Sequence, residues 1–398
     1  MMKKPLAKIA TLRLLLFAAL GCASARGQSQ PQNPSTQDPA EVQRARQKFV
    51  KERAETKFYR KKFDLTGLPA YRPKQQVSGL IRQWGSNYFA DSPLAQVWED
   101  GFRKFQPDVK FEDHLRTTEH AIPALYTRVA DIGLMGRQIM WDELLAYQRE
   151  FSALPLEVTV CTSSYNVPGW TFALGVFVNT ANPISKLTVK QLDGIFGAQR
   201  TGGWKGLEWD QSIERGPESN IRTWGQLGLT GEWADKPIHV YGYNLKFHFA
   251  DEFDKKVFNG GDKWTESLRE YANQAKPDGS GLLTAAEIFM PELSKDPYGI
   301  AYTGIPYLTP QTKAVALAVH DGGPYVELSL ENVQDRSYPL IRDVYFYLNR
   351  EKGKPLDPKL KEFLRYILSR DGQEAVEQDG KFLPLTAEAA REQLMKLE

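Results

Sequence analysis

The chain has 398 residues, with 41% hydrophobic and 25% charged side chains. These proportions are typical of a folded globular protein and exclude a disordered or fibrous chain. The formal net charge is only +2, and no nucleic-acid-binding motif occurs, so DNA and RNA are excluded as expected partners.

Residues 1–25 are predicted to be a signal peptide. Basic residues precede the apolar run 14–20, which is too short to span a membrane. Residues 23–25 (Ala-Ser-Ala) fit the rule for cleavage after small residues. Residues 20–22 (Leu-Gly-Cys) resemble a bacterial lipoprotein signal, in which Cys22 would carry a lipid. Both modes of processing remain possible, and lipid attachment at Cys22 is favoured. We expect a periplasmic or cell-envelope location.

Residues 26–77 are expected to be a tether followed by a basic segment. The first part is rich in Gln, Pro, Ser and Asn and can bury little apolar surface. Residues 40–62 carry many Arg and Lys side chains, which favours a solvated helix near the tether. Contact of this segment with anionic lipid is the alternative.

Strand-like and helix-like runs alternate from residue 78 onward, which favours an α/β fold. Strands are expected at 79–85, 109–113 and 130–136. Helices are expected at 93–105 and 119–129. Ser92 and Thr118 are candidate N-caps of these helices.

The second half of the chain repeats this alternation. Thr188 and Gln191 form a predicted capping box, and Asp357 and Thr386 are predicted to cap later helices. A helix is expected at 249–258, where three acidic residues are interpreted as a solvated face: Asp251, Glu252 and Asp254. Further strands are expected at 176–178, 236–244, 298–304 and 314–319. The apolar run 338–349 is predicted to be a long central strand.

No catalytic or metal-binding pattern is present in the sequence. The five histidines lack metal-ligand spacing, and neither a nucleophile elbow nor a phosphate loop occurs. Cys161 lies in an apolar stretch and is predicted to be a buried small hydrophobe. We therefore expect no enzymatic activity, no cofactor and no metal; a secreted phosphate-ester hydrolase would lack its nucleophile.

Several phrases, in order, resemble the phosphate-binding solute receptors of ABC importers. They include GSNYFADSPLAQVWEDGF, ADIGLMGRQI, FVNTANPISKLTVKQLDGIFG, YGIAYTG and YPLIRDVYFYLN. The resemblance covers about residues 78–385 and implies a type II periplasmic-binding-protein fold: two α/β lobes of mixed sheets flanked by helices, with a ligand cleft between them. It places residues 78–178 and 338–398 in lobe 1 and 179–337 in lobe 2, with crossings near Asn179 and Tyr338.

The resemblance also implies ligand contacts in lobe 1. Ser86 and Asn87 would hold an anion above the helix 93–105, although a plain capped turn explains them too. Thr117 and Thr118 would form a second contact, with capping as the alternative role of Thr118. Arg137 stands where the best-studied receptors have Asp, and its guanidinium would bind two anion oxygens. The alternative for Arg137 is an ion pair with Asp131 or Glu143.

In lobe 2 the sequence departs from the family. Phe247 and His248 stand where relatives carry Ser-Gly, so the usual oxyanion cradle is missing. Tyr243, Asn244 and His248 remain as candidate ligand contacts. Lys246 could restore charge or could be a solvated surface residue.

The expected function is capture of phosphate or a related oxyanion by a monomeric receptor, which closes on the anion and delivers it to an ABC permease. The alternative is a cell-envelope sensor or adaptor that keeps the fold but binds another ligand or none. An interlobe gap filled by aromatic rings, or an outward-facing Arg137, would argue against the receptor hypothesis.

Overall fold

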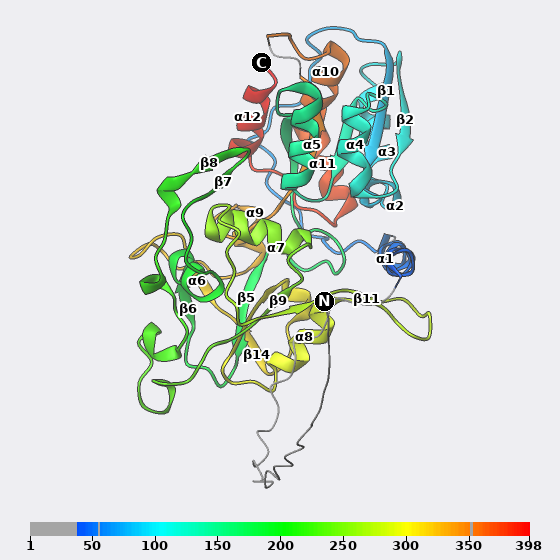
Figure 1. Ribbon diagram of the computed structural model, residues 1–398. Coiled ribbons are helices and arrows are strands. Elements are labelled where there is room, and N and C mark those ends of the chain that lie inside the picture. Colours follow the sequence, from blue (N-terminus) through cyan, green and yellow to red (C-terminus); the bar gives the residue numbers. More distant parts are fainter. Residues whose placement is uncertain (1–37, 55, 351–352) are drawn as a thin grey trace, which may run out of the picture.

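Two five-stranded sheets organise the chain into two lobes. A computed structural model describes residues 38–54, 56–350 and 353–398, and Figure 1 shows one lobe above the other. The first sheet has the order β2 (Val109–His114), β1 (Gly79–Gly85), β3 (Ile132–Met135), β16 (Asp343–Leu348) and β4 (Leu156–Thr162). The second has the order β10 (Leu268–Tyr271), β9 (His239–Tyr243), β13 (Gly299–Thr303), β5 (Gly175–Asn179) and β14 (Thr312–Ala314).

Both sheets are mixed, as the fold prediction required. In the first, β1 is parallel to β2 and β3, whereas β16 is antiparallel to β3 and β4. In the second, β9 is parallel to β10 and β13, whereas β5 is antiparallel to β13 and β14. The minor two-stranded pairs are β6 (Lys186–Thr188) with β15 (Ala316–Ala318), β7 (Gly203–Lys205) with β8 (Glu208–Asp210), and β11 (Gln274–Ala275) with β12 (Leu282–Leu283).

Amphipathic helices cover the sheets. The first lobe carries α2 (Tyr88–Asp91), α3 (Leu94–Arg103), α4 (Ala121–Tyr126), α5 (Trp141–Phe151), α10 (Pro358–Ile367), α11 (Arg370–Asp379) and α12 (Ala387–Lys396). The second carries α6 (Val189–Phe196), α7 (His248–Phe253), α8 (Ala285–Leu293) and α9 (Leu330–Gln334). Three predicted caps are confirmed: Thr188 and Gln191 form a capping box, and Asp357 and Thr386 accept backbone N–H bonds. The cap predicted at Ser92 was wrong, because Pro93 holds the N-cap position of α3.

The crossing between the sheets differs from the expected position. β5 was expected to close the first lobe, but it pairs with β13 and β14 in the second sheet. The chain therefore leaves the first sheet between Thr162 and Gly175, earlier than Asn179. It re-enters the first sheet at β16. That strand begins only at Asp343, because residues 338–342 pass between the lobes. The prediction of a long strand was therefore wrong. The strand does lie in the interior of the sheet, between β3 and β4.

The segment before the first sheet is more ordered than expected. α1 (Pro39–Ala54) buries Phe49 and Val50, so the prediction of a solvated helix was wrong. The chain from residue 56 to 77 packs on the first lobe. The Tyr59 hydroxyl accepts a hydrogen bond from the backbone N–H of Tyr165 at 2.7 Å, and the Tyr71 hydroxyl donates to Glu362 at 2.6 Å. The apolar side chains of this segment follow no helical or strand period, so the sequence did not predict that they pack against the lobes. The predicted signal, Cys22 included, lies outside the described residues.

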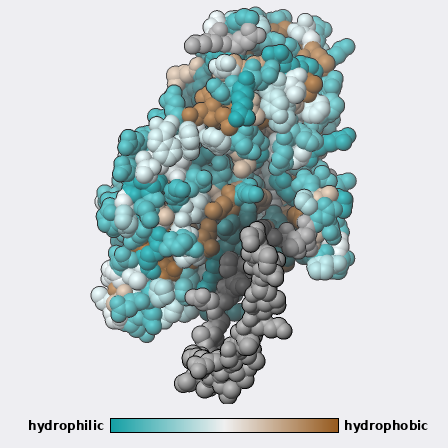
Figure 2. Space-filling view, in the orientation of Figure 1, coloured by the Kyte–Doolittle hydropathy of each residue, from teal (hydrophilic) through white to brown (hydrophobic). Residues whose placement is uncertain are grey.

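The surface seen in Figure 2 is mainly hydrophilic, with hydrophobic residues in small separate areas. Among the helices of the described residues, none combines the length and the hydropathy needed to cross a bilayer.

Gly85 ends β1 and sets the turn that faces the second lobe. Its φ is +141°, and a Cβ placed there would lie 2.1 Å from the backbone oxygen of Leu134. We expect Gly85→Ala to lower the free energy of unfolding by roughly 3 kcal/mol, because it adds a backbone collision to the strain of positive φ. Urea unfolding would compare Gly85→Ala with the control Gly322→Ala. Gly322 has a φ of +78° but open space around it. Equal losses for the two variants would contradict the close approach.

Candidate functional site

A buried ion pair joins the two lobes at the centre of the molecule. Glu252 on α7 accepts a hydrogen bond from Arg342, which precedes β16, and both side chains are almost fully buried. The other Glu252 oxygen accepts from the backbone N–H of Gln138 at 3.0 Å. Glu252 was interpreted from the sequence as part of a solvated face. That prediction was wrong, because this face of α7 lies against the first lobe.

Arg342 keeps part of its guanidinium uncommitted. The guanidinium carbon Cζ of Arg342 lies 4.5 Å from the centroid of the Phe249 ring, and its Nη1 donates to the Phe172 carbonyl at 3.5 Å. Its buried Nη2 has no hydrogen-bond partner among the described residues. A buried donor without a partner is costly, so this nitrogen marks a place where a further acceptor would be favourable.

Arg137 follows β3 and faces the interior, with 4% of its surface exposed. It forms a two-pronged ion pair with Glu143, with both nitrogen–oxygen distances at 2.7 Å, and donates to the Gln138 carbonyl at 3.1 Å. The other proposed partner, Asp131, binds Arg82 instead. Burial disfavours the charge of Arg137, but its bonds to Glu143 raise the pKa above the usual value, so the guanidinium stays charged.

Ser86 and Asn87 lie in the turn before α2, a short helix that sequence reasoning missed. They were expected to stand directly above α3. Ser86 is fully buried and accepts from the backbone N–H of Tyr88 at 3.3 Å. Asn87 donates to Asp91 at 2.7 Å. The Asn87 side chain is therefore engaged locally, whereas the turn as a whole lies at the end of β1 that faces the second lobe.

Thr117 and Thr118 begin the short 3-10 helix Thr118–His120. Thr118 is buried, and its predicted capping bond does not form; the N-cap position belongs to Thr117. Thr117 donates to the Glu119 carboxylate. Burial tends to raise the pKa of Glu119, but Arg46, Thr117 and Arg137 lower it overall, so the carboxylate remains charged beside these arginines.

Aromatic rings occupy most of the gap where the second lobe meets the first. The ring of Phe249 stacks on Phe172 with centroids 5.0 Å apart and on Tyr243 at 4.5 Å. Phe247 caps this group at 5.2 Å from Phe249. The missing Ser-Gly cradle is thus replaced by an aromatic cluster, an arrangement that weighs against simple transfer of the family's contacts.

The other candidate residues of the second lobe separate into two groups. Tyr243 is buried and shares a 2.6 Å hydrogen bond with Thr303. Asn244 accepts from the backbone N–H of Lys246 at 3.1 Å, and both residues belong to the local turn rather than to the cavity described next. His248 begins α7 and lies at the cavity.

A small cavity of about 40 Å³ remains beside the aromatic cluster. Its lining includes residues from both lobes and from α1: Arg46, Tyr88, Thr171, Phe172, Tyr243, Phe247, His248 and Tyr307. Burial lowers the pKa of His248 well below its usual value, and the charges of Arg342, Arg137 and Arg46 lower it further. The imidazole is therefore neutral at physiological pH, and three guanidinium groups lie within electrostatic range of it.

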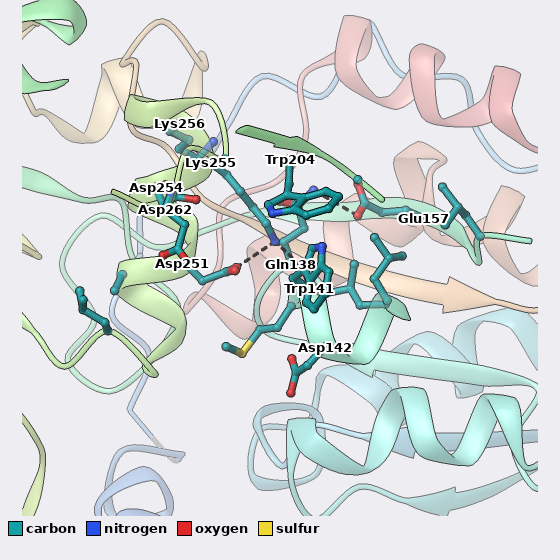
Figure 3. Close-up of a pocket in the computed structure, with 18 of the residues that line it drawn as sticks. Gln138, Trp141, Asp142, Glu157, Trp204, Asp251, Asp254, Lys255, Lys256 and Asp262 are labelled. Carbon is teal, nitrogen blue, oxygen red and sulfur yellow. Dashed lines mark hydrogen bonds and ion pairs between the residues drawn. The ribbon is translucent and has the colours of Figure 1, made fainter. Parts of the chain in front are cut away.

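A second, larger pocket of about 870 Å³ lies between α5, α7 and the β7–β8 hairpin (Figure 3). Trp141 from lobe 1 and Trp204 from lobe 2 meet there with ring centroids 5.5 Å apart. Lys255 bonds to Asp251 at 2.8 Å and to the Ile139 carbonyl at 2.7 Å, which adds another link between the lobes. Burial raises the pKa of Asp254, at the edge of this pocket, to about 7.

Sequence reasoning missed three charged residues of the centre: Arg46, Glu252 and Arg342. Arg342 had a recognisable signal, because a charge within the mainly apolar run 338–349 must find a partner when buried. Arg46 and Glu252 lie in charge-rich stretches, where solvated residues look the same. The described residues contain no group of three or more His, Cys, Asp or Glu side chains suited to a metal ion.

The raised pKa of Asp254 predicts how stability depends on pH. Below about pH 4 the carboxyl is protonated in both the folded and the unfolded chain, and the cost of ionising it in the folded chain grows as pH rises toward 7. Asp254→Asn removes this cost. The free energy of unfolding of the variant, relative to that of the parent, should therefore increase by on the order of 2 kcal/mol between pH 5 and pH 8. Urea unfolding at both pH values measures it, with the exposed Asp142→Asn as the charge control. A stability difference independent of pH would contradict it.

The comparisons with known proteins agree with the two-lobe architecture. A family model described as a PBP superfamily domain matches residues 84–371. The phosphate-binding protein PstS of Pseudomonas aeruginosa is 32% identical over 330 residues, which is 83% of this chain and 90% of that protein. Protein SphX of Synechococcus elongatus is 27% identical over 54% of this chain and 55% of its own length.

Among solved structures, PstS from Borrelia burgdorferi is 16% identical with a TM-score of 0.46, covering 78% of this chain and all of that one. An ABC-type phosphate transport receptor from Vibrio cholerae is 15% identical with a TM-score of 0.44, covering 76% and 99%. This chain belongs to the periplasmic-binding-protein (PBP) superfamily.

Proposed function

We propose that this protein captures phosphate or a related small oxyanion between its lobes and presents it to the permease of an ABC importer. One observation carries the proposal: Arg46 and His248 line the small interlobe cavity, and Arg342 and Arg137 lie close enough for their charges to act on the same imidazole. The guanidinium group offers paired donors that match the oxygens of a tetrahedral anion. The captured anion leaves the site chemically unchanged.

The size of the cavity supports a small ligand. A volume of about 40 Å³ accommodates only a few water molecules, so a sugar or peptide could not enter without a large rearrangement. The surrounding aromatic rings exclude water, which strengthens each charge-assisted hydrogen bond. Glu143 and Glu252 already pair with Arg137 and Arg342, and Glu119 interacts with Arg46 electrostatically, so an anion must compete with these carboxylates.

The proposal assigns roles to the residues expected from the sequence. The turn at Ser86 and Asn87, the Thr117–Thr118 segment and Arg137 would contact the anion from lobe 1, although none of them is among the residues that line the small cavity. His248 would line the site from lobe 2, with Tyr243 beneath it and Asn244 holding the adjacent turn. Capture would follow the usual logic of such receptors, in which the ligand favours the closed form by contacting both lobes.

The relatives and the sequence support the cellular setting. The Pseudomonas aeruginosa relative carries the name phosphate-binding protein. The signal-like N-terminal residues support export, and the Leu-Gly-Cys sequence at 20–22 supports lipid attachment at Cys22. We infer that the protein acts outside the cytoplasm as a monomer that meets its permease at the membrane.

Binding of inorganic phosphate is the direct test. We expect heat release in isothermal titration and a rise in melting temperature that grows with ligand concentration, because a ligand that binds only the folded state stabilises it. Sulfate and molybdate should be titrated in parallel to define which oxyanion binds best. Absence of heat and of thermal shift with all three anions would contradict the proposal.

The aromatic cluster predicts a gain of affinity on opening the second lobe. The double variant Phe247→Ser/His248→Gly restores the residue types that relatives carry, so backbone amides could approach the anion. We expect phosphate to bind at least about fivefold more tightly than to the parent, a change worth about 1 kcal/mol. Leu245→Ser, an exposed change in the same loop, serves as the control. Unchanged or weaker affinity in the double variant would show that the rings are part of the site rather than an obstruction.

A second candidate is a receptor-fold sensor or adaptor that binds no transported anion. It is favoured by the stacking of Phe172, Phe249 and Tyr243 where the family's cradle would stand. This candidate predicts no anion binding by the parent protein, so the titration separates the two.

A further inference from the structure

Helix α1 lies outside the matched domain but contacts both lobes. The family match begins at residue 84, whereas α1 spans Pro39–Ala54. α1 contacts α2 of the first lobe and both β11 and β12 of the second. Figure 1 shows α1 at the level of the junction between the two lobes, close to β11. A segment in this position bridges the mouth of the cleft.

Packing fixes the position of α1. Phe49 and Val50 are 7% and 1% exposed. The ring of Phe49 rests on Gly169, where a Cβ would approach it to 2.3 Å, so only glycine permits this contact. Arg53 lies 3.5 Å from the centroid of the Phe49 ring and donates to the Phe49 carbonyl at 2.7 Å. α1 is therefore seated by specific contacts with the crossing segment.

The same face of α1 carries Arg46 into the cavity. Arg46 lies three and four residues before Phe49 and Val50, so the three side chains share one side of the helix. Its Nη2 donates to the Tyr88 hydroxyl at 3.4 Å, and it lines the small cavity together with His248. Burial disfavours the charge of Arg46, but Tyr88 and Glu119 raise its pKa overall, so it remains a cation.

We propose that Arg46 is a ligand-contact residue, which α1 brings across the cleft from outside the receptor domain. This inference rests on the proposed function and adds a contact that the matched domain cannot supply. The long 3.4 Å bond to Tyr88 leaves the guanidinium free to turn toward an anion. Arg46 then supplies the cavity with a cation where the second lobe's usual backbone cradle is missing.

The experiment compares Arg46→Gln with Arg44→Gln in the full chain. Arg44 lies on the same helix and is exposed, so its variant removes the same charge away from the cavity. Titration with inorganic phosphate should show affinity at least about tenfold weaker for Arg46→Gln and within twofold of the parent for Arg44→Gln. Arg46→Lys should recover part of the affinity, because it keeps the charge but loses the fork. Melting temperatures of the free proteins would separate lost contact from lost stability.

A second variant tests the role of α1 without changing Arg46. Phe49→Ala loosens the seat of the helix, so phosphate affinity should fall in the same direction as in Arg46→Gln. Parent-like affinity of Arg46→Gln would overturn the inference while leaving the proposed function intact. Failure of the parent protein itself to bind any oxyanion would overturn the proposed function, and the inference with it.

Discussion

The buried pair of Glu252 and Arg342 is the interaction on which the arrangement of the two lobes depends. Each charge is withdrawn from water, and either one alone would carry a large desolvation cost. Glu252 also receives the Gln138 backbone N–H, so a carboxylate of lobe 2 is satisfied entirely by lobe 1. Separating the lobes would break these bonds together. The bonds therefore hold the two lobes in one relative position.

This constraint explains the unusual chemistry of the centre. Receptors of this fold are expected to hold an anion with backbone amides from both lobes, yet here the second lobe offers rings. The charged groups come instead as arginine–carboxylate pairs, and His248 stays neutral among them. Recognition would therefore depend on exchanging one acceptor for another on the same guanidinium groups. The unpartnered Nη2 of Arg342 shows that the internal carboxylates do not satisfy every donor.

Two further elements join the lobes on either side of this centre. α1 spans the junction through Phe49 and Arg46, and the β7–β8 hairpin brings Trp204 against Trp141. Both contacts are mainly apolar and lie closer to the surface than Glu252. Opening of the cleft would have to release at least one of them. The contact between the lobes is thus stabilised at α1 and at the β7–β8 hairpin as well as at Glu252, and a ligand would need to contribute only the remaining difference in free energy.

The sequence by itself determined what depends on neighbouring residues. The capping box at Thr188 and Gln191 and the cap at Asp357 were predictable because each bond spans only two or three residues. The alternation of strands and helices predicted an α/β fold, and the resemblance of the ordered phrases to a known family implied its two lobes. The first crossing was misplaced, because an apolar strand such as β5 fits either sheet until its partners are known.

Only the tertiary structure decided which charges are buried. Glu252 and Asp251 are adjacent acidic residues in one helix, and nothing local shows that Glu252 meets Arg342 from ninety residues away. Arg46 and Arg44 differ in the same way: both are basic residues of α1, but one faces the cavity and the other faces solvent. Burial is a property of the packed chain, so the place of Arg46 at the cavity could not be read before α1 was placed against both lobes.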